Sequence, residues 1–525
     1  MGRLRGSNER KKREAISNQI DGFFFRFLTI INAVNISNRK EVFYTKNDIT
    51  EWLDIEDKES EIIDSGIIGD TKYLTIRKKL TPKYCPVCGS RMHSHGQFHR
   101  SPNNQVLSDG YKVKLTVIGR NWECSNEECR YTCRDEFPFL EKYKKNTKIM
   151  PMMIIQAMKD IHLSCRQIAE RFHVSDTYVH DIFTAYIDLP RLPLTEYISI
   201  DEVFVNMAPD MKYALIIMDF STGNILDILP SRRKKYTEDY FFHIPLQERN
   251  RVKYLICDMY NPYINYTITY FHNAKAVVDS FHVIQWLLRL INNYINDVKK
   301  KYQARDRKKL VEDNRSRNRE FESQRDSKEV YILKHAKWVL LQNRSNYQYH
   351  EPRFNRFLGR DMDSTSWYSE FMKLDRHFPE IKLEKDLYED FNSRYLNDPL
   401  SASAALEQLI AHYAKSEIDI FRKFSRLLNV YHDQIINSFI AVPVADTEEH
   451  EARLRRLSNG PMESFNNEPS GLRSNSHGIT NFNFFRNRLL WFSRDDARIL
   501  AIPKPTRLVK SFRGHKRGKY RKKMY

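Results

Sequence analysis

The chain has 525 residues and a formal net charge of +19, with 86 Lys and Arg against 67 Asp and Glu. This length predicts several domains with sizeable cores, and the charge makes a polyanion the expected partner, although some basic proteins use charge only for solubility. We expect neither a membrane span nor a secretory signal, because no apolar run approaches ~20 residues and Arg26 interrupts the apolar Phe23–Phe25. The expected location is therefore cytoplasmic, and nucleoid-associated if the source is bacterial.

The first part of the chain, residues 1–80, is predicted to be a helical extension with a basic start. A basic tract runs from Arg3 to Arg13, and an amphipathic helix pattern follows over residues 18–35. A second helix signal, with its own cap residues, spans residues 45–53. A small helical packing unit suits these features better than a role in dimerisation or in binding DNA ends.

Two cysteine pairs predict a structural zinc site. Cys85 and Cys88 form a C-x2-C knuckle followed by glycine, and Cys124 and Cys129 form a looser second pair. Thiolates at this spacing suit Zn²⁺, and seven cysteines in a cytoplasmic chain favour metal binding or packing over disulfides. Residues 111–117 alternate as a strand between the pairs, so we predict a zinc-binding β-module over residues 81–136 that unfolds without its metal. Three nearby side chains are alternative ligands, although surface or packing positions suit them better: His93, His95 and Cys133.

Residues 137–192 show a helical periodicity that is broken once, which is typical of a helix-turn-helix. Helices are predicted over residues 166–172 and 177–183, with Ser164 and Ser175 as their caps. An ordinary αα-hairpin has the same pattern, but the neighbouring zinc module and the basic charge favour DNA binding. The second helix would then present these side chains to a major groove: Ser175, Asp176, Thr177, Tyr178 and His180.

Strand and helix signals follow one another from residue 197 onward. We predict strands over residues 197–205, 211–219, 224–229, 252–258 and 274–279, and helices over residues 236–249, 262–272 and 281–302. Three strands and then alternating helices and strands is the order of an RNase H-like fold, in which the first and fourth strands pair. That pairing would make Asp201, inside the first strand, a neighbour of Asp258, at the end of the fourth.

Three acids are candidate catalytic residues: Asp201, Asp258 and Glu463. An acid beside a buried strand is costly unless a cation, a proton or a donor compensates it, although a single acid at a strand end is more often a turn or cap residue. Glu463 follows Pro461, which suits the first turn of a helix. Carboxylates from two strands and a helix are the ligands that two Mg²⁺ ions require for phosphoryl transfer, with Mn²⁺ as a substitute.

Other polar residues near these acids receive lesser roles. Asp279 and His282 follow the fifth strand and form a second tier, His282 for proton transfer, for contact with the DNA backbone or for packing in its own helix turn. Asp219 precedes a turn, and Glu202 points away from Asp201 across its strand, so neither is assigned a catalytic role. Two arginines after the third strand are candidate DNA contacts or part of a solvated loop: Arg232 and Arg233.

The ordered set of motifs resembles the DDE transposases of bacterial insertion sequences, specifically the ISL3 group. The matching segments are Ile200 to Glu202, residues 256–263, residues 278–283, Asn459 to Glu463 with Asn466 and Asn467, and more weakly residues 336–343. The resemblance covers roughly residues 81–500. It implies a multidomain α/β protein, in which the zinc module and helix-turn-helix precede an RNase H-like catalytic domain at residues 193–292 and 456–500. A helical insertion at residues 293–455 interrupts that domain, and a basic tail at residues 501–525 follows it.

The resemblance implies an enzyme that binds the terminal inverted repeats of an insertion sequence, as a homodimer on double-stranded DNA. It would cleave the element's ends and join them to target DNA, with Mg²⁺ held by the three acids and Zn²⁺ as a structural ion. Two alternatives remain open. One is a catalytically inactive, transposase-derived DNA-binding protein, and the other is a different RNase H-like nuclease such as a Holliday-junction resolvase.

The chain departs from the ISL3 pattern after the third acid. Members of the family have glycine after this Glu and then a long basic helix. Here Ser464 follows Glu463, and Pro469 with Gly471 predicts that the helix breaks after about two turns.

Overall fold

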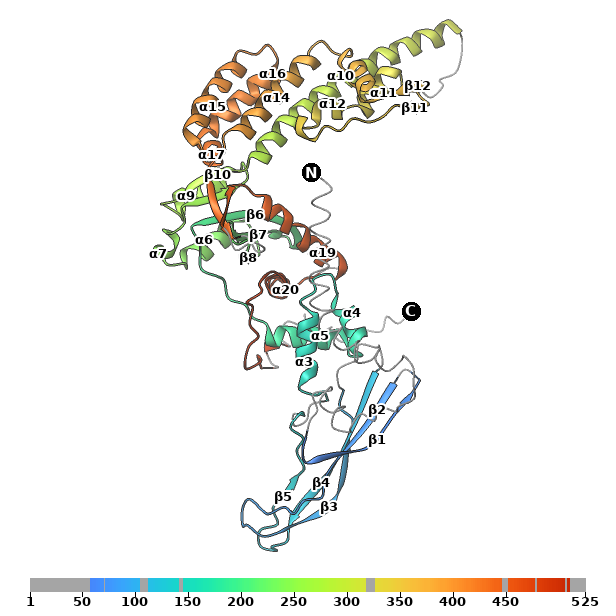
Figure 1. The fold of residues 1–525 in the computed structure, drawn as a ribbon, viewed down its shortest axis with the longest axis vertical. Coiled ribbons are helices and arrows are strands. Elements are labelled where there is room, and N and C mark those ends of the chain that lie inside the picture. The colour runs from blue at the N-terminus through green and yellow to red at the C-terminus, as the bar shows by residue number, and fades with distance from the viewer. Residues whose placement is uncertain are drawn as a thin grey trace, which may run out of the picture. The chain divides into compact units, whose positions relative to one another are not determined.

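The computed structural model describes residues 57–69, 71–103, 112–140, 145–317, 326–445, 452–476, 479–505 and 508–509. The protein is of mixed α/β class (Figure 1) and divides into two compact units. The first holds residues 1–155 and 171–173, and the second holds residues 156–170 and 174–525. The helices expected at residues 18–35 and 45–53, and almost all of the basic tail, lie outside the described residues. Within the described part of the chain, every helix is too short or too polar to cross a bilayer.

The first unit is built on one five-stranded sheet. Its strands are β1 (Ser60–Ile68), β2 (Thr71–Lys78), β3 (Met92–Arg100), β4 (Lys112–Cys124) and β5 (Thr132–Arg134). The order is β1-β2-β4-β3 with β5 on β4, and only the β2–β4 pairing is parallel. The prediction of a helical extension is therefore wrong for residues 60–78, because Leu74 and Ile76 alternate with polar residues and bury against Leu115 and Val117 of β4.

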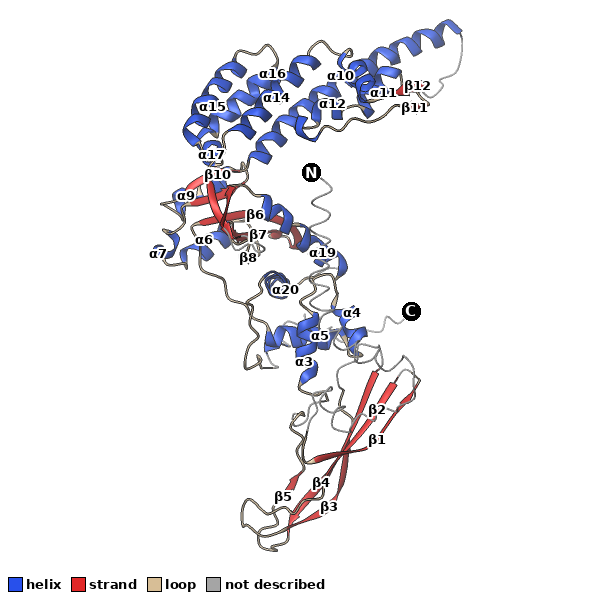
Figure 2. Ribbon diagram, in the orientation of Figure 1, coloured by secondary structure: helices blue, strands red, loops and turns tan. Residues whose placement is uncertain are grey.

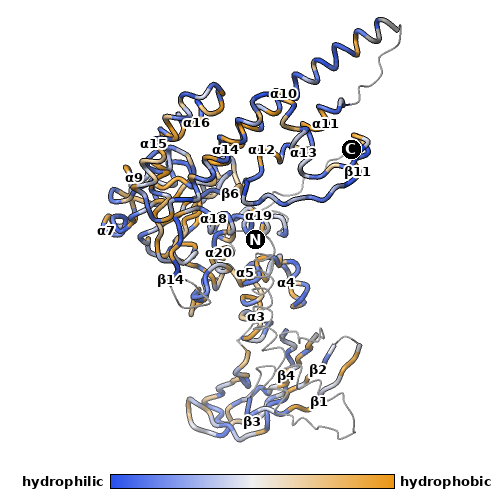
Figure 3. The backbone as a smooth tube through the Cα atoms, turned by 45° about the horizontal axis from the view of Figure 1, so that its top comes forward, coloured by the Kyte–Doolittle hydropathy of each residue, from blue (hydrophilic) through white to orange (hydrophobic). Residues whose placement is uncertain are grey.

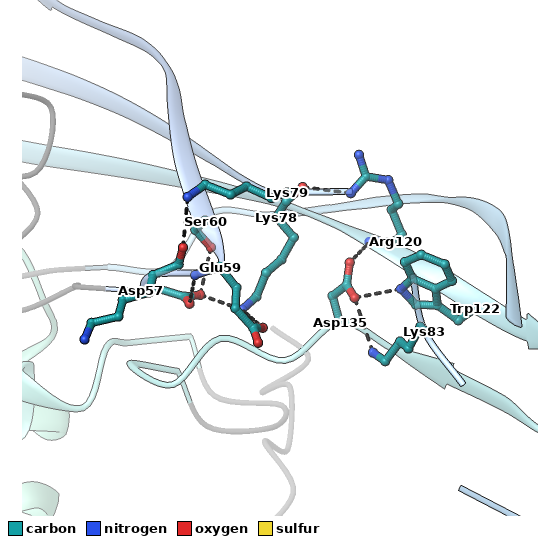
Figure 4. Close-up of polar contacts among 10 residues, drawn as sticks. Asp57, Glu59, Ser60, Lys78, Lys79, Lys83, Arg120, Trp122 and Asp135 are labelled. Atoms are coloured by element: carbon teal, nitrogen blue, oxygen red, sulfur yellow. Dashed lines mark hydrogen bonds and ion pairs between the residues drawn. The ribbon is translucent and has the colours of Figure 1, made fainter. Parts of the chain in front are cut away.

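Polar contacts secure both edges of this sheet (Figure 4). The Lys78 side chain is almost fully buried and lies 2.7 Å from the Asp57 carboxylate, so its charge is paired. Asp135, just after β5, accepts hydrogen bonds from the Trp122 indole at 2.7 Å and from the Arg120 backbone N–H at 2.8 Å. These bonds fix β5 against β4 beside the cysteine cluster.

Three helices follow: α3 (Ile149–Ala157), α4 (Cys165–Phe172) and α5 (Asp176–Tyr186). Ser164 and Gln167 cap α4 reciprocally, since each side chain accepts from the other's backbone N–H. Ser175 caps α5 as expected, accepting from the Tyr178 N–H. The turn between α4 and α5 passes through His173, whose φ of 52° reverses the chain in the left-handed region.

A second five-stranded sheet lies in the second unit. Its strands are β6 (Tyr197–Ala208), β7 (Met211–Asp219), β8 (Ile225–Leu229), β9 (Tyr254–Cys257) and β10 (Lys275–Val278), in the order β10-β9-β6-β7-β8. β6, β9 and β10 are parallel, while β7 and β8 are antiparallel additions. The expected pairing of the first strand with the fourth is confirmed, with Ser199 opposite Ile256. The carboxyl end of β9 consequently lies beside the middle of β6, close to Asp201.

The helices around this sheet differ from expectation in length. The predicted helix at residues 236–249 is two helices, α6 (Lys234–Phe242) and α7 (Leu246–Arg249), because Pro245 cannot donate a helical hydrogen bond. The helix predicted at residues 262–272 is also divided, into α8 (Asn261–Ile264) and α9 (Tyr266–Thr269). The long helix α10 (Ser280–Arg317) continues well past the expected end at residue 302.

The segment after β10 is mostly helical (Figure 2), as expected for the insertion. It continues from α10 through α11 (Lys328–His335), α12 (Trp338–Leu341), η1 (Arg344–Asn346), α13 (Ser364–Met372), α14 (Phe378–Arg394), α15 (Pro399–Ala414), α16 (Asp419–Val430) and α17 (His432–Asn437). A small hairpin of β11 (Arg353–Asn355) and β12 (Arg360–Met362) was not predicted. These helices share one large apolar core, while the far end of α10 is hydrophilic (Figure 3).

The chain returns to the sheet through the hairpin of β13 (Ala441–Ala445) and β14 (Ala452–Arg456), followed by α18 (Gly460–Phe465), α19 (Asn467–Asn475) and α20 (Phe482–Ser493). A break after Glu463 was predicted, but it falls at Asn466, before Pro469. Pro469 lies in the first turn of α19, where a missing N–H costs nothing, and Gly471 is held inside that helix. The break therefore turns the chain close behind Glu463 without unfolding it.

Candidate active site and metal centre

Asp201 lies inside β6 and is only 9% exposed. Its Oδ1 accepts from the Glu202 backbone N–H at 2.7 Å, and its Oδ2 accepts from the Asn466 side-chain amide at 2.6 Å. Burial, and next the charge of Asp258, raise the pKa of Asp201 to about 6. Two donors thus hold the carboxylate in place without offsetting the full cost of its burial, as expected for a ligand of a cation.

Asp258, Glu463 and His282 meet beside it. Asp258 directly follows β9, Glu463 lies in α18, and His282 lies in the first turn of α10. The His282 Nε2 atom is 2.6 Å from Asp258 Oδ1 and 3.9 Å from Glu463 Oε1. Burial lowers the pKa of His282, but contact with Asp258 and the surrounding acids outweighs it, so the net shift is upward. The structure therefore brings the second and third candidate acids to one imidazole.

Asp279 completes the cluster and is 2% exposed. Its Oδ2 accepts from the Asn459 backbone N–H at 2.8 Å, and its Oδ1 accepts from the Phe281 N–H at 3.0 Å. Ligand atoms of Asp279, His282 and Glu463 all lie within 4.8 Å of one another. The pKa of Glu463 is raised by burial and then by the charge of Asp279. Asp279 is thus part of the same acidic cluster as the predicted acids.

The donor set fits hard divalent cations. Asp279 and Glu463 share a group with His282, Asp258 contacts the same imidazole, and Asp201 is close enough to Asp258 to feel its charge. Carboxylate oxygens are the ligands that Mg²⁺ and Mn²⁺ prefer. Two facing atoms, Asp258 Oδ1 and His282 Nε2, are buried without an aligned hydrogen-bond partner despite their close contact. At 2.6 Å the two atoms form an ion pair when His282 is protonated, so the fit to a cation rests on the carboxylates.

Two asparagines in the segment around Glu463 were missed as site residues. Asn459 accepts a short hydrogen bond from the Ser199 hydroxyl of β6 while its backbone binds Asp279, and Asn466 binds Asp201. They anchor α18 to the sheet on both sides of Glu463. The sequence signal was present, because both flank the third acid in the matched motif, but a motif does not reveal which side chain an amide contacts.

Other sequence candidates lie differently. Glu202 forms an ion pair with Arg232 at 2.6 Å and accepts from the Tyr263 hydroxyl at 3.0 Å, so Arg232 is engaged within the protein. Arg233 is exposed at the start of α6. Asp219 accepts from Thr195, Ser221 and Thr222 around its turn, which agrees with its omission from catalysis.

A second candidate metal centre lies in the first unit. The Cys85 and Cys129 sulfurs are 3.7 Å apart and those of Cys88 and Cys124 are 3.4 Å apart, and all four ligand atoms fall within 4.8 Å. Backbone N–H groups point at Cys85 and Cys124 from two residues further on, at 3.4 Å in each knuckle. Hydrogen bonds with Ser90 lower the pKa of Cys88 to about 6. The cluster is therefore compatible with a tetrahedral zinc ion.

The three other candidates near this cluster are outside the group of four. Cys133 packs against it as a partly buried thiol. His93 and His95 lie 3.9 and 3.6 Å from the Glu123 carboxylate on the sheet surface. These residues therefore occupy the surface and packing positions that the sequence favours for them.

The predicted recognition residues occupy the start of α5. Ser175, Asp176 and Thr177 are exposed, and Tyr178 is half-buried. The His180 ring stacks on Phe484 of α20 with centroids 4.4 Å apart, so part of its surface is covered by protein. The exposed end of α5 is consequently the part that a ligand can reach.

Comparisons with known proteins agree with this geometry. The family model of the ISL3-type DDE transposases, described as transposase, matches residues 198–489. The transposase for insertion sequence element IS1001 of Bordetella parapertussis is 24% identical over 280 residues, which cover 52% of this chain. The aligned part covers 62% of that relative, less than two thirds of its length.

Proposed function

Because the chain belongs to the ISL3 family of DDE transposases, we propose that it binds the terminal inverted repeats of an insertion sequence and catalyses Mg²⁺-dependent cleavage and strand transfer of DNA. The observation that carries the proposal is the convergence of Asp201, Asp258 and Glu463 from segments far apart in the chain. Asp279 and His282 lie within the same cluster. We assign the three acids as the catalytic metal ligands.

Bound Mg²⁺, or Mn²⁺ in its place, would supply charge stabilisation at phosphorus and an activated water or DNA 3′-hydroxyl. The chain's own residues hold the geometry for this. Asp201 is fixed by Glu202 and Asn466, and each of its oxygens keeps a further lone pair for a ligand. His282 carries a raised pKa beside Asp258, so it can hold a proton close to the DNA oxygens that change bonding.

The sheet order and the position of the acids at its edge support an RNase H-like catalytic domain interrupted by the helical insertion. We propose that the zinc module and the exposed end of α5 select the DNA ends, with a homodimer bringing two ends together. Arg233 remains a proposed phosphate contact. Arg232 is reassigned to holding Glu202, because the two form an ion pair.

Cleavage of DNA flanks by the purified protein tests the proposal. In Mg²⁺, wild-type protein should nick the terminal repeats of its element, and Glu463→Gln should abolish nicking while leaving DNA binding intact. Glu468→Gln is the matched control, because Glu468 lies in α19 and approaches His162 rather than the acidic cluster.

The rival functions give different outcomes in the same assay. Tight binding to the repeats without nicking in Mg²⁺ or Mn²⁺ would indicate an inactive DNA-binding descendant. Equal nicking of any four-way junction, without preference for the repeats, would indicate a resolvase-like nuclease.

A further inference from the structure

A cavity of about 360 Å³ lies in the helical insertion. It is formed by α12, the β11–β12 hairpin, α13 and the segment between η1 and β11. Its volume is at the lower end of the range of small-ligand sites. The lining residues are Trp338, His350, Glu351, Arg353, Phe354, Asn355, Met362 and Trp367.

Aromatic rings dominate the walls. Trp338 and Trp367 are half-buried, and neither indole N–H has an acceptor among the described residues, so both donors are open to a ligand. The His350 ring lies edge-on to Trp338 with centroids 6.4 Å apart. Phe354 is 66% exposed, so most of its side chain is accessible to a ligand. The walls therefore offer flat apolar faces and free donors.

The cavity is pre-organised by local bonds. Asn355 accepts from the Phe357 and Leu358 N–H groups at 3.0 Å, and its amide donates to the Tyr331 hydroxyl at 3.2 Å. The His350 backbone N–H donates to the Ser364 hydroxyl at 2.8 Å. Because these residues are already held in place, little conformational entropy would be lost from the walls when a ligand binds.

Opposite charges flank the opening. Glu351 and Arg353 are exposed, and neither side chain forms a hydrogen bond or ion pair with another described side chain. A carboxylate only accepts and a guanidinium only donates, so together they match the mixed acceptors and donors along the edge of a planar heterocycle. Arg344 and Arg356 are exposed nearby in the chain and add the positive charge that phosphates favour.

We propose that this cavity binds a single unpaired nucleobase of the DNA on which the protein acts. Stacking between aromatic side chains needs no particular base, and the flanking polar pair reads the base edge. The proposal rests on the proposed function only in taking DNA as the partner.

The fold also places the cavity within reach of the acidic cluster. The Lys337 ammonium, next to Trp338, donates at 2.9 Å to both Asn292 and Asn296 of α10. These residues follow His282 by 10 and 14 positions on one continuous helix, which corresponds to about 15–21 Å.

Equilibrium binding of two labelled strands of equal charge tests the proposal with the full-length, zinc-loaded protein. One strand is a 12-nucleotide oligothymidine, and the other is an abasic sugar–phosphate strand of the same length. We expect the base-bearing strand to bind about 5- to 150-fold more tightly, as base–aromatic stacking implies. Equal affinity for the two strands would overturn the proposal.

Two variants locate the effect. Phe354→Ala removes an exposed ring from the cavity and should abolish most of the preference, whereas Tyr368→Ala removes a ring that is 42% exposed but lies outside the lining. Retention of the preference in Phe354→Ala would also overturn the proposal. Neither strand is cleaved in this measurement, and Asp201→Asn should show the wild-type preference, so failure of catalysis and failure of the cavity are distinguished.

Discussion

At the scale of single residues, the acidic cluster lowers the stability of the fold, because its carboxylates are held close together and partly buried. Four carboxylates share a partly dry site with one imidazole, and hydrogen bonds from Glu202, Asn459 and Asn466 only partly offset the cost. The pKa of Asp201 is raised to about 6 from an ordinary value of 3.8 by burial first and then by Asp258. The metal-free site is therefore destabilising at neutral pH, and a bound cation would relieve it.

The pH dependence of stability follows from this shift. Between pH 3.8 and about 6 the folded protein binds the Asp201 proton more tightly than the unfolded chain, so stability falls as pH rises through that window. The loss reaches on the order of 3 kcal/mol above pH 6.

We predict that Asp201→Asn raises the apparent midpoint of thermal unfolding of the metal-free protein at pH 8, and much less at pH 4. The Asn466 amide can flip to accept from the new side chain, since its oxygen has no partner now. Added Mg²⁺ should stabilise wild type but not the variant. A lower midpoint for Asp201→Asn at pH 8 would contradict the assignment.

Asn466 is a positioning residue for Asp201. Asn466→Ala should lower the rate of DNA cleavage about 10- to 100-fold and raise the Mg²⁺ concentration needed for half-maximal rate, as loss of support for a metal ligand does. Binding of the terminal repeats should not change. Asn467→Ala is the neighbouring control, and equal losses in both variants would point to a general disturbance of α18 and α19 instead.

At the scale of elements, the cysteine cluster holds together the short knuckles at the end of the first sheet. Cys88→Ser should lower the zinc content, measured on the purified protein, from one ion per chain towards zero and should expose this end of the sheet to proteolysis. Cys133→Ser should retain the ion, because that thiol packs beside the four ligands without joining them. Full zinc occupancy in Cys88→Ser would count against the assigned ligand set.

Helix α20 joins the loop before α4 to the sheet of the second unit. Arg488 is 1% exposed and donates to the Asp160 and Leu163 carbonyls at 2.8 and 2.7 Å, while Arg494 donates to the Ile225 and Leu226 carbonyls of β8. Burial lowers the pKa of Arg488 to about 10. The Asp160 carbonyl also accepts from the Leu163 backbone N–H at 3.3 Å, so the guanidinium adds a second donor to that turn.

Arg488→Met should therefore destabilise this region by about 1–3 kcal/mol, since the Leu163 carbonyl loses its donor while the Asp160 carbonyl keeps the Leu163 N–H. Native-state hydrogen exchange of the α4 segment would report the change. Arg498→Met, at an exposed position just beyond α20, should have little effect. Equal protection of α4 in wild type and Arg488→Met would exclude this role for α20.

The alternation of apolar and polar residues predicted the five strands of the second sheet and the pairing that makes Asp201 and Asp258 neighbours. The local sequence pattern did not predict the secondary structure correctly where contacts between distant segments determine it. Residues 60–78 are strands because β2 pairs with β4, which follows β3 in the chain. Pro469 lies in the first turn of α19 because the helix break falls before it, at Asn466. Asn459, Asn466 and the cavity around Trp338 depend on contacts between distant segments, which no single stretch of sequence displays.

At the scale of the whole molecule, the net positive charge and the acidic cluster both fit a protein that acts on DNA. A net charge of +19 attracts a polyanion without selecting a sequence, so binding should weaken steeply as salt rises. Selection is assigned to the zinc module and α5, and chemistry to the acids at the sheet edge. DNA binding, selection of the DNA ends and cleavage can therefore be tested separately, with a different variant for each.

The central claim is tested most directly by strand cleavage and joining in a single reaction. Purified protein would be incubated with its flanking terminal repeats, a target plasmid and Mg²⁺, beside Asp201→Asn and the control Asp219→Asn, which changes a turn acid of the same sheet. The account predicts nicks at the repeat ends and joined products with wild type and Asp219→Asn, and neither with Asp201→Asn. Cleavage and joining that persist in Asp201→Asn would contradict it.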